Sequence, residues 1–222
     1  MSRIIAGDLG GRRLRTPPGE HTRPTSDRVR EALFSRVESL LGGLDGVVVL
    51  DLYAGSGAVG LEAVSRGAAH ALLVESDRRA VAVVRDNVRA LDVSAQVRVV
   101  GDRVERLLAR SPGPSEWAAE LVFADPPYVL DHASLRTVLA AGAASGWFAA
   151  EALMVVERPT RGEAWEFPPG VRSEGNRRYG ETTLWYGRRE PSAQPAAPPP
   201  AEHQADLAGH RGAVARDRRS PS

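Results

Sequence analysis

The chain has 222 residues, 42% of them hydrophobic and 26% charged, with a formal net charge of only +1. This length suits one well-packed domain. No apolar run reaches the roughly 20 residues of a membrane helix, and none follows Met1 as a secretory signal. Together with the lack of cysteine, this leads us to expect a cytoplasmic protein. The absence of cysteine excludes disulfides, thiolate metal sites and cysteine nucleophiles.

The first segment, residues 1–45, is expected to form a hairpin and a helix that pack on the domain core. Short extended stretches around Gly7, Gly10 and Gly11 favour a hairpin turned by glycine. An amphipathic helix follows, because apolar side chains recur at helical spacing on one of its faces. These side chains are Val29, Leu33, Val37 and Leu40.

All basic residues of the chain except histidine are arginines, and they are concentrated near its beginning. The eight arginines through Arg36 are opposed by four acidic residues, and this local excess of four positive charges suits a phosphate-binding face. The candidates for phosphate contact are Arg12, Arg13, Arg23, Arg28 and Arg30. Coding bias is the alternative explanation, because alanine, glycine, proline and valine are abundant as well.

From residue 46 to residue 189 the pattern alternates between short apolar strands and helices. The expected strands are 47–52, 71–74, 97–100, 120–124 and 153–157, with further extended stretches near 165–167 and at 182–186. The expected helices are 58–66, 77–91, 103–110 and 135–144. Such alternation predicts a doubly wound, mostly parallel α/β sheet of about seven strands, with helices on both faces.

Residues 190–222 are rich in proline, alanine and charge, and they contain no tryptophan, tyrosine or phenylalanine. Such a segment cannot bury enough apolar surface to offset the entropy lost on ordering. We therefore expect a disordered tail.

A glycine-rich turn follows the first buried strand. Segment 51–60 reads Asp-Leu-Tyr-Ala-Gly-Ser-Gly-Ala-Val-Gly, and its glycines let the backbone approach a ligand while it turns from strand to helix. Gly55, Gly57 and Gly60 also match the pattern G-x-G-x-x-G, so a dinucleotide-binding oxidoreductase is one interpretation. Asp51, at the strand end, would repel a pyrophosphate and would favour a cationic ligand, such as a sulfonium with its α-amino group.

Acidic residues also end the next two strands. Glu75 stands where a carboxylate can hold both hydroxyls of a ribose, and Asp102 stands where it can accept from an adenine amino group. Ligands of doubly wound folds bind outside the carboxyl ends of the strands. Three acids at three successive strand ends therefore predict a ligand site there.

The second motif, Asp125-Pro126-Pro127-Tyr128, follows the fourth strand. An exocyclic amino group of a nucleobase is a poor nucleophile, because its lone pair is delocalised into the ring. The Asp125 carboxylate and the Pro126 carbonyl can accept from its two N–H groups, and Tyr128 offers a face on which an extruded base can stack. Consecutive prolines fix the backbone, although they also occur in ordinary rigid turns. We find no histidine or acidic cluster with metal-ligand spacing, so no metal is expected.

Together these motifs resemble the Rossmann-like methyltransferases that act on amino groups of nucleic acids, and more narrowly the RsmD family of bacterial small-subunit ribosomal RNA guanine-N2 methyltransferases. The matching segments are 3–7, 23–31, 51–57, 125–128 and 179–182. The resemblance covers about residues 3 to 188, and Arg-Pro-Thr-Ser-Asp-Arg-Val-Arg-Glu at 23–31 is its most specific part. It implies S-adenosylmethionine as the cofactor and 16S rRNA, within an assembling 30S subunit, as the substrate. We expect a monomer.

By this resemblance, residues at the carboxyl ends of the strands would hold the cofactor. They are Asp51, Tyr53, Ala54, Gly55, Ser56, Gly57, Glu75, Ser76, Asp102 and Asp125. The catalytic residues around the target amine would be Asp125, Pro126, Pro127 and Tyr128. The arginines named above would contact RNA.

Three alternatives remain at this point. Adenine-N6 or cytosine-N4 methylation of DNA uses the same tetrapeptide, although about 185 ordered residues leave little room for the extra recognition domain of a DNA enzyme. A dinucleotide oxidoreductase would leave segment 125–128 without a role. A catalytically silent RNA-binding domain would need neither the glycine turn nor the acids.

Overall fold

The computed structural model describes residues 2–17, 27–113 and 116–191. The chain divides into two units, Met1–Ser192 and Ala193–Ser222. The predicted disorder of the tail, like the predicted role of Arg23, therefore concerns residues that lie almost entirely outside the described ranges.

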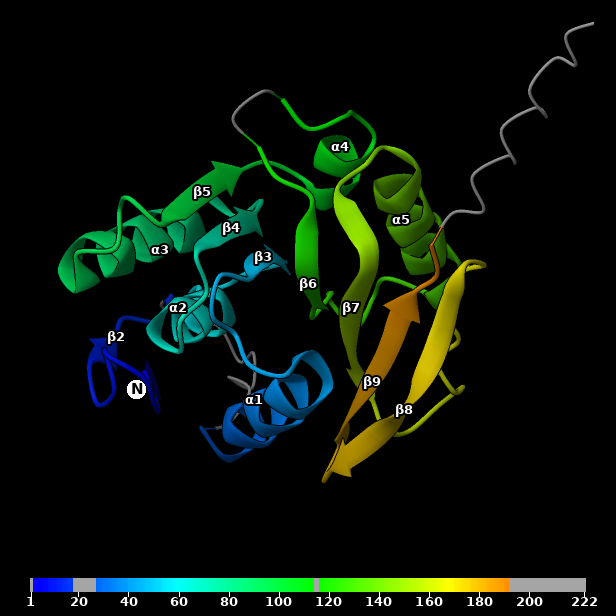
Figure 1. Cartoon of the computed structure of the whole chain (residues 1–222), viewed down its shortest axis with the longest axis horizontal. Helices are drawn as coiled ribbons and strands as arrows, with labels where there is room; N and C mark the ends of the chain where they lie inside the picture. Colours follow the sequence, from blue (N-terminus) through cyan, green and yellow to red (C-terminus); the bar gives the residue numbers. More distant parts are fainter. Residues whose placement is uncertain (1, 18–26, 114–115, 192–222) are drawn as a thin grey trace, which may run out of the picture. The chain divides into compact units, whose positions relative to one another are not determined.

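A seven-stranded sheet runs through the first unit in the order β5-β4-β3-β6-β7-β9-β8 (Figure 1). Its strands are β3 (Val48–Leu52), β4 (His70–Glu75), β5 (Val97–Gly101), β6 (Ala119–Ala124), β7 (Phe148–Pro159), β8 (Val171–Tyr179) and β9 (Thr182–Arg189). Neighbours from β5 to β7 are parallel, whereas β9 runs antiparallel to both β7 and β8. The predicted sheet, mostly parallel and of about seven strands, is confirmed.

The helices cover both faces of this sheet (Figure 1). They are α1 (Asp27–Leu41), α2 (Ala58–Ser65), α3 (Arg78–Leu91), α4 (Val104–Leu108) and α5 (His132–Ala144). Because successive strand residues point to opposite faces, Phe123 and Val122 of β6 belong to different apolar cores. Phe123 shares its core with α1, α2 and α3, and Val122 shares the other with α4 and α5. Among the described residues, no helix is both long and apolar enough to cross a membrane.

The N-terminal hairpin, β1 (Ser2–Arg3) with β2 (Arg13–Leu14), lies against α2. The fully buried Glu62 of α2 accepts hydrogen bonds from the backbone amides of Ile5 and Ala6, at 2.7 and 3.0 Å. Gly7 has a φ of +78°, and a Cβ on it would lie 1.7 Å from the carbonyl oxygen of Ser65. Only glycine allows this approach, so the hairpin predicted from its glycines is docked through one of them.

A buried ionic cluster joins α1 to α2. Glu62 lies 3.6 Å from Nε of Arg30 and 2.9 Å from Nε of Arg66. Towards the surface, Arg66 also pairs with Glu31 at 2.8 Å and with Glu38 at 3.1 Å. The cluster therefore connects the first helix, the hairpin and the helix that follows the glycine turn.

The late strands differ from the sequence prediction. Residues 165–167 form no strand; Trp165 is buried in a loop, where its ring meets His132 and Phe167 edge-on. Strand β8 was not expected, because most of its residues are exposed and its sequence therefore has no apolar alternation. Helix α5 begins at His132 rather than Leu135, since the Asp131 side chain caps it by accepting from the Ser134 amide at 2.8 Å.

Candidate functional site

The turn after β3 is held in an unusual backbone conformation. Tyr53, Gly55 and Gly57 all have positive φ, at 63°, 55° and 78°. For tyrosine this conformation costs about 1–3 kcal/mol, and such strain is concentrated at functional sites. A Cβ on Gly57 would lie 2.8 Å from Cδ2 of Leu73, whereas a Cβ on Gly55 would meet nothing within 4 Å. The turn is therefore tight towards the sheet and open on the side of Gly55.

Asp51 lies at the end of β3, directly below this turn. Its side chain is buried, and its Oδ2 accepts a hydrogen bond from the Gly60 amide at 2.9 Å. Burial raises the pKa of Asp51 to about 7, and the nearby Glu75 carboxylate adds to the rise, against the effect of the Gly60 hydrogen bond. A cation placed beside Asp51 would favour its ionised form.

Glu75, at the end of β4, organises the glycine turn. Its Oε2 accepts from the Gly55 amide at 2.9 Å, and its Oε1 accepts from the amides of Ser76 and Asp77 at 2.7 and 2.8 Å. A carboxylate has about four acceptor positions, so three of them serve the protein itself. Glu75 therefore fixes the loop and keeps limited capacity for a ligand hydroxyl.

Asp102 follows β5, the next strand along the sheet edge. Its Oδ1 accepts from the Arg103 amide at 2.8 Å and lies 3.3 Å from Nη1 of Arg106. The side chain remains 33% exposed, so it is accessible to a ligand. Asp51, Glu75 and Asp102 thus stand at the carboxyl ends of three adjacent strands.

A cleft of about 550 Å³ opens at this end of the sheet, within the size range of small-molecule sites. Its lining residues are Tyr53, Val74, Ser76, Arg103, Val104, Glu105, Pro127, Val129 and Leu130. The cleft brings Tyr53 of the glycine turn and Ser76, which follows β4, together with Pro127 of the second motif. The sequence analysis did not identify Val104, because an apolar residue in a short helix looks like an ordinary core residue.

The second motif follows β6, whose register places Phe123 opposite Asp51. Asp125 comes two residues after Phe123. Desolvation raises the pKa of Asp125 well above the ordinary value, and the nearby acids Glu157 and Asp51 add to the rise, while Arg158 opposes it. Pro126 is buried, whereas Tyr128 is 63% exposed. A half-buried carboxylate therefore stands close to an exposed aromatic ring in one short loop.

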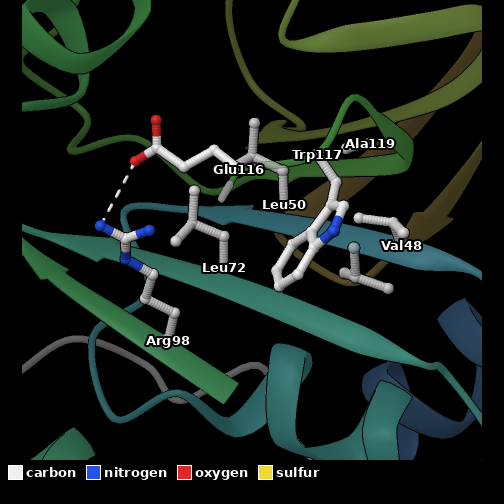
Figure 2. Close-up of a pocket in the computed structure, with 8 residues that line it drawn as sticks. Val48, Leu50, Leu72, Arg98, Glu116, Trp117 and Ala119 are labelled. Atoms are coloured by element: carbon white, nitrogen blue, oxygen red, sulfur yellow. Dashed lines mark ion pairs between the residues drawn. The ribbon is translucent and has the colours of Figure 1, made fainter. Parts of the chain in front are cut away.

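A second cavity lies at the opposite, amino end of the strands and has room for about one water molecule, at roughly 10 Å³. Its walls include Val48, Leu50 and Leu72, with the Trp117 indole on one side (Figure 2). Its charged side chains, Glu116 and Arg98, pair with each other at 3.6 Å. This cavity contains no group arranged for chemistry.

The arginines expected to contact RNA have different surroundings. Arg12, Arg13 and Arg28 are exposed, and Arg12 donates to the Ala90 carbonyl at 2.6 Å. Arg30 is only 1% exposed and lies beside Glu62 in the ionic cluster, so the assignment of Arg30 to phosphate binding is wrong. Its sequence neighbours gave no sign of this burial.

The described residues contain no group of three or more histidine, aspartate or glutamate side chains placed to hold a metal ion. The carboxyl ends of the strands instead carry carboxylates and backbone amides beside a partly apolar cleft. This combination suits an organic ligand with hydroxyl, amino and cationic groups.

The strand order, the glycine turn after β3 and the Asp-Pro-Pro-Tyr loop after β6 define a Rossmann-like methyltransferase. The fold agrees with the solved structure of yhhF from Escherichia coli, which has a TM-score of 0.73 and 31% identity over 86% of this chain and 98% of that chain.

The family is also established by sequence. The model of the family described as "Conserved hypothetical protein 95" matches residues 2–188, and the chain belongs to this family of methyltransferases. Ribosomal RNA small subunit methyltransferase D of Escherichia coli K12 is 39% identical over 155 residues, which are 70% of this chain and 73% of that protein. YlbH of Bacillus subtilis is 37% identical over 57% of this chain and 66% of its own length, slightly less than two thirds.

Proposed function

We propose that this chain transfers a methyl group from S-adenosylmethionine to the exocyclic N2 amino group of a guanine in 16S ribosomal RNA, within an assembling 30S subunit. The observation that carries the proposal is the placement of Asp51 and Asp125 at the ends of the adjacent strands β3 and β6, in a family with ribosomal RNA methyltransferases. In this proposal Asp51 would face the cationic cofactor, and Asp125 would face the target amine.

The residues present fit the cofactor. S-adenosylmethionine supplies an activated methyl group on a positively charged sulfur. Buried Asp51 offers the complementary negative charge, and Glu75 and Asp102 offer acceptors to hydroxyl and amino groups. Tyr53, Ser76 and Val104 line the cleft between them. The open space above Gly55 allows a ligand to lie directly on the backbone of the turn.

The Asp125-Pro126-Pro127-Tyr128 loop would hold the target base. Asp125 and the Pro126 carbonyl accept the two N–H groups of the amine, which turns the nitrogen lone pair out of the ring plane and towards the methyl group. Asp125 and the Pro126 carbonyl would thereby orient the nitrogen for attack on the methyl group. The proton lost by the nitrogen would pass to the Asp125 carboxylate or to solvent, and the second product would be S-adenosylhomocysteine. The exposed ring of Tyr128 stacks on the extruded base.

The exposed Arg12, Arg13 and Arg28 are available to RNA phosphates. Arg23 stays a prediction, because it lies outside the described residues, and Arg30 is omitted because it is buried. A monomeric state and a cytoplasmic location also stay predictions.

Two experiments test the proposal. Calorimetry should detect binding of S-adenosylmethionine or S-adenosylhomocysteine and no comparable binding of NAD(H) or NADP(H). Mass spectrometry of ribosomal RNA nucleosides should find one N2-methylguanosine that is absent from cells lacking this gene. Tight nicotinamide binding would contradict the cofactor assignment. Loss of N6-methyladenine or N4-methylcytosine from DNA would instead support the alternative substrate.

A further inference from the structure

A buried arginine stands one strand away from Asp125. Arg158 lies near the end of β7, is 5% exposed, and is opposite Thr183 of β9 in an antiparallel pair. Strands β6 and β7 are parallel, with Ala124 beside Val156. The next residues along the two strands, Asp125 and Glu157, therefore continue side by side, and Arg158 follows immediately.

The guanidinium of Arg158 is tied to the loop that carries the second motif. Its Nη2 donates to the Leu130 carbonyl at 2.8 Å, and the Leu130 amide donates to the Pro127 carbonyl at 2.9 Å. The loop is therefore closed on itself and anchored to β7 through one side chain. The strand end that carries Arg158 is itself fixed, since the amide of Thr160 donates to the Glu181 carbonyl at 2.8 Å.

The remaining donors of Arg158 do not serve the packing of the fold. Nε and Nη1 are buried and have no hydrogen-bond partner among the described residues. A buried guanidinium with unused donors costs free energy, so its retention calls for a compensating interaction. Arg158 interacts electrostatically with Asp125, Asp131, Tyr128 and Tyr53.

We propose that Arg158 is a positioning residue of the methyl-transfer site, which anchors the 125–131 loop through the Leu130 carbonyl and places a fixed positive charge beside Asp125. This inference rests on the proposed function for its catalytic consequence. The charge matters because Asp51 on β3 and Glu157 on β7 are buried acids that interact with Asp125. Both raise the pKa of Asp125 and Arg158 lowers it, so Arg158 favours the ionised carboxylate that accepts N–H groups.

Three substitutions separate the two roles. Arg158→Lys keeps the charge but loses the planar fork that reaches the Leu130 carbonyl. Arg158→Gln loses the charge but keeps N–H donors for that carbonyl, and Arg158→Met loses both. Arg188→Gln is the matched control, because Arg188 of β9 likewise donates to backbone carbonyls, those of Glu151 and Leu40, away from the site.

Single-turnover methyl transfer to 30S subunits, measured against pH, gives the catalytic result. We expect Arg158→Met to slow transfer by roughly tenfold to hundredfold, as small displacements of reacting groups do, with cofactor affinity nearly unchanged. The acidic limb of the pH profile should move to higher pH in Arg158→Gln and Arg158→Met, because the pKa of Asp125 rises without the cation. It should stay in place in Arg158→Lys and Arg188→Gln. A native rate and profile in Arg158→Met would overturn the proposal.

Two further measurements do not require activity. Hydrogen exchange of the Leu130 amide should accelerate in Arg158→Met and Arg158→Lys, and much less in Arg158→Gln. The carboxyl ¹³C resonance of Asp125 should titrate at higher pH in Arg158→Gln than in the native chain. If the native chain methylates no 30S substrate, the proposed function fails while these two results still test Arg158. Unchanged exchange and titration in all three variants would contradict its role.

Discussion

Glu62→Gln should destabilise the fold more than any surface substitution, because Glu62 is the centre of the buried ionic cluster. Its carboxylate is fully buried and accepts from the amides of Ile5 and Ala6, while it pairs with Arg30 and Arg66. Glutamine removes the negative charge and turns an N–H donor towards this set of donors. Removing one partner of a buried ion pair lowers the free energy of unfolding by about 3–5 kcal/mol. For a unit of this size that lowers Tm by roughly 6–20 °C.

Glu38→Gln is the matched control, since Glu38 also pairs with Arg66 but its side chain is 40% exposed. An exposed pair contributes about 0–1 kcal/mol, so this variant should unfold almost like the native chain. Chemical denaturation can be followed by tryptophan fluorescence, since Trp147 and Trp165 are buried. Equal small losses, below about 1 kcal/mol, in both variants would refute the view that the cluster holds the hairpin and α1 in place.

Three further predictions address the site. Tyr128→Ala should weaken capture of the RNA by about 1–3 kcal/mol if the ring stacks on the base, and an unchanged dissociation constant would argue against stacking. The pKa of Asp51 is raised from 3.8 to about 7, so the stability contributed by its protonated form is present below pH 4 and is lost as pH rises towards 7. Asp51→Asn should therefore flatten a plot of Tm against pH between pH 4 and pH 7. An unaltered slope would contradict this assignment. Replacing Arg12 and Arg13 by glutamine should reduce the slope of log affinity against log salt by about two, whereas an unchanged slope would return both to a solvated face.

The sheet could be predicted because its central strands are buried on both faces. Val48–Leu52 and Ala119–Ala124 are mostly apolar runs bounded by turns. Such runs can be recognised from the sequence without knowledge of the neighbouring strands. Strand β8 has no comparable signal, because solvent covers most of its side chains and β9 alone determines its pairing. The stretch at 165–167 gave the opposite error, since Trp165 is buried by loop packing rather than by strand pairing.

The candidate site was predictable where chemistry and strand ends coincide along the chain. Asp51 and Glu75 lie at the ends of recognisable strands, and Asp125 directly follows one. Their position at the same end of the sheet therefore follows from the parallel topology. Arg158 was not found, because its position beside Asp125 depends on the register of β6 against β7. Arg30 was misassigned for a similar reason: only the packing of α1 on α2 brings it to Glu62.

Single-turnover methyl transfer by Asp125→Asn tests the central claim most directly. The native chain, S-adenosylmethionine and 30S subunits lacking the modification should yield N2-methylguanosine in 16S rRNA. The amide of Asp125→Asn can turn its N–H donors towards those of the amine, so transfer should slow by about a hundredfold or more while cofactor affinity changes little. Transfer at the native rate by Asp125→Asn, or methyl groups on any other atom of the RNA, would contradict the account.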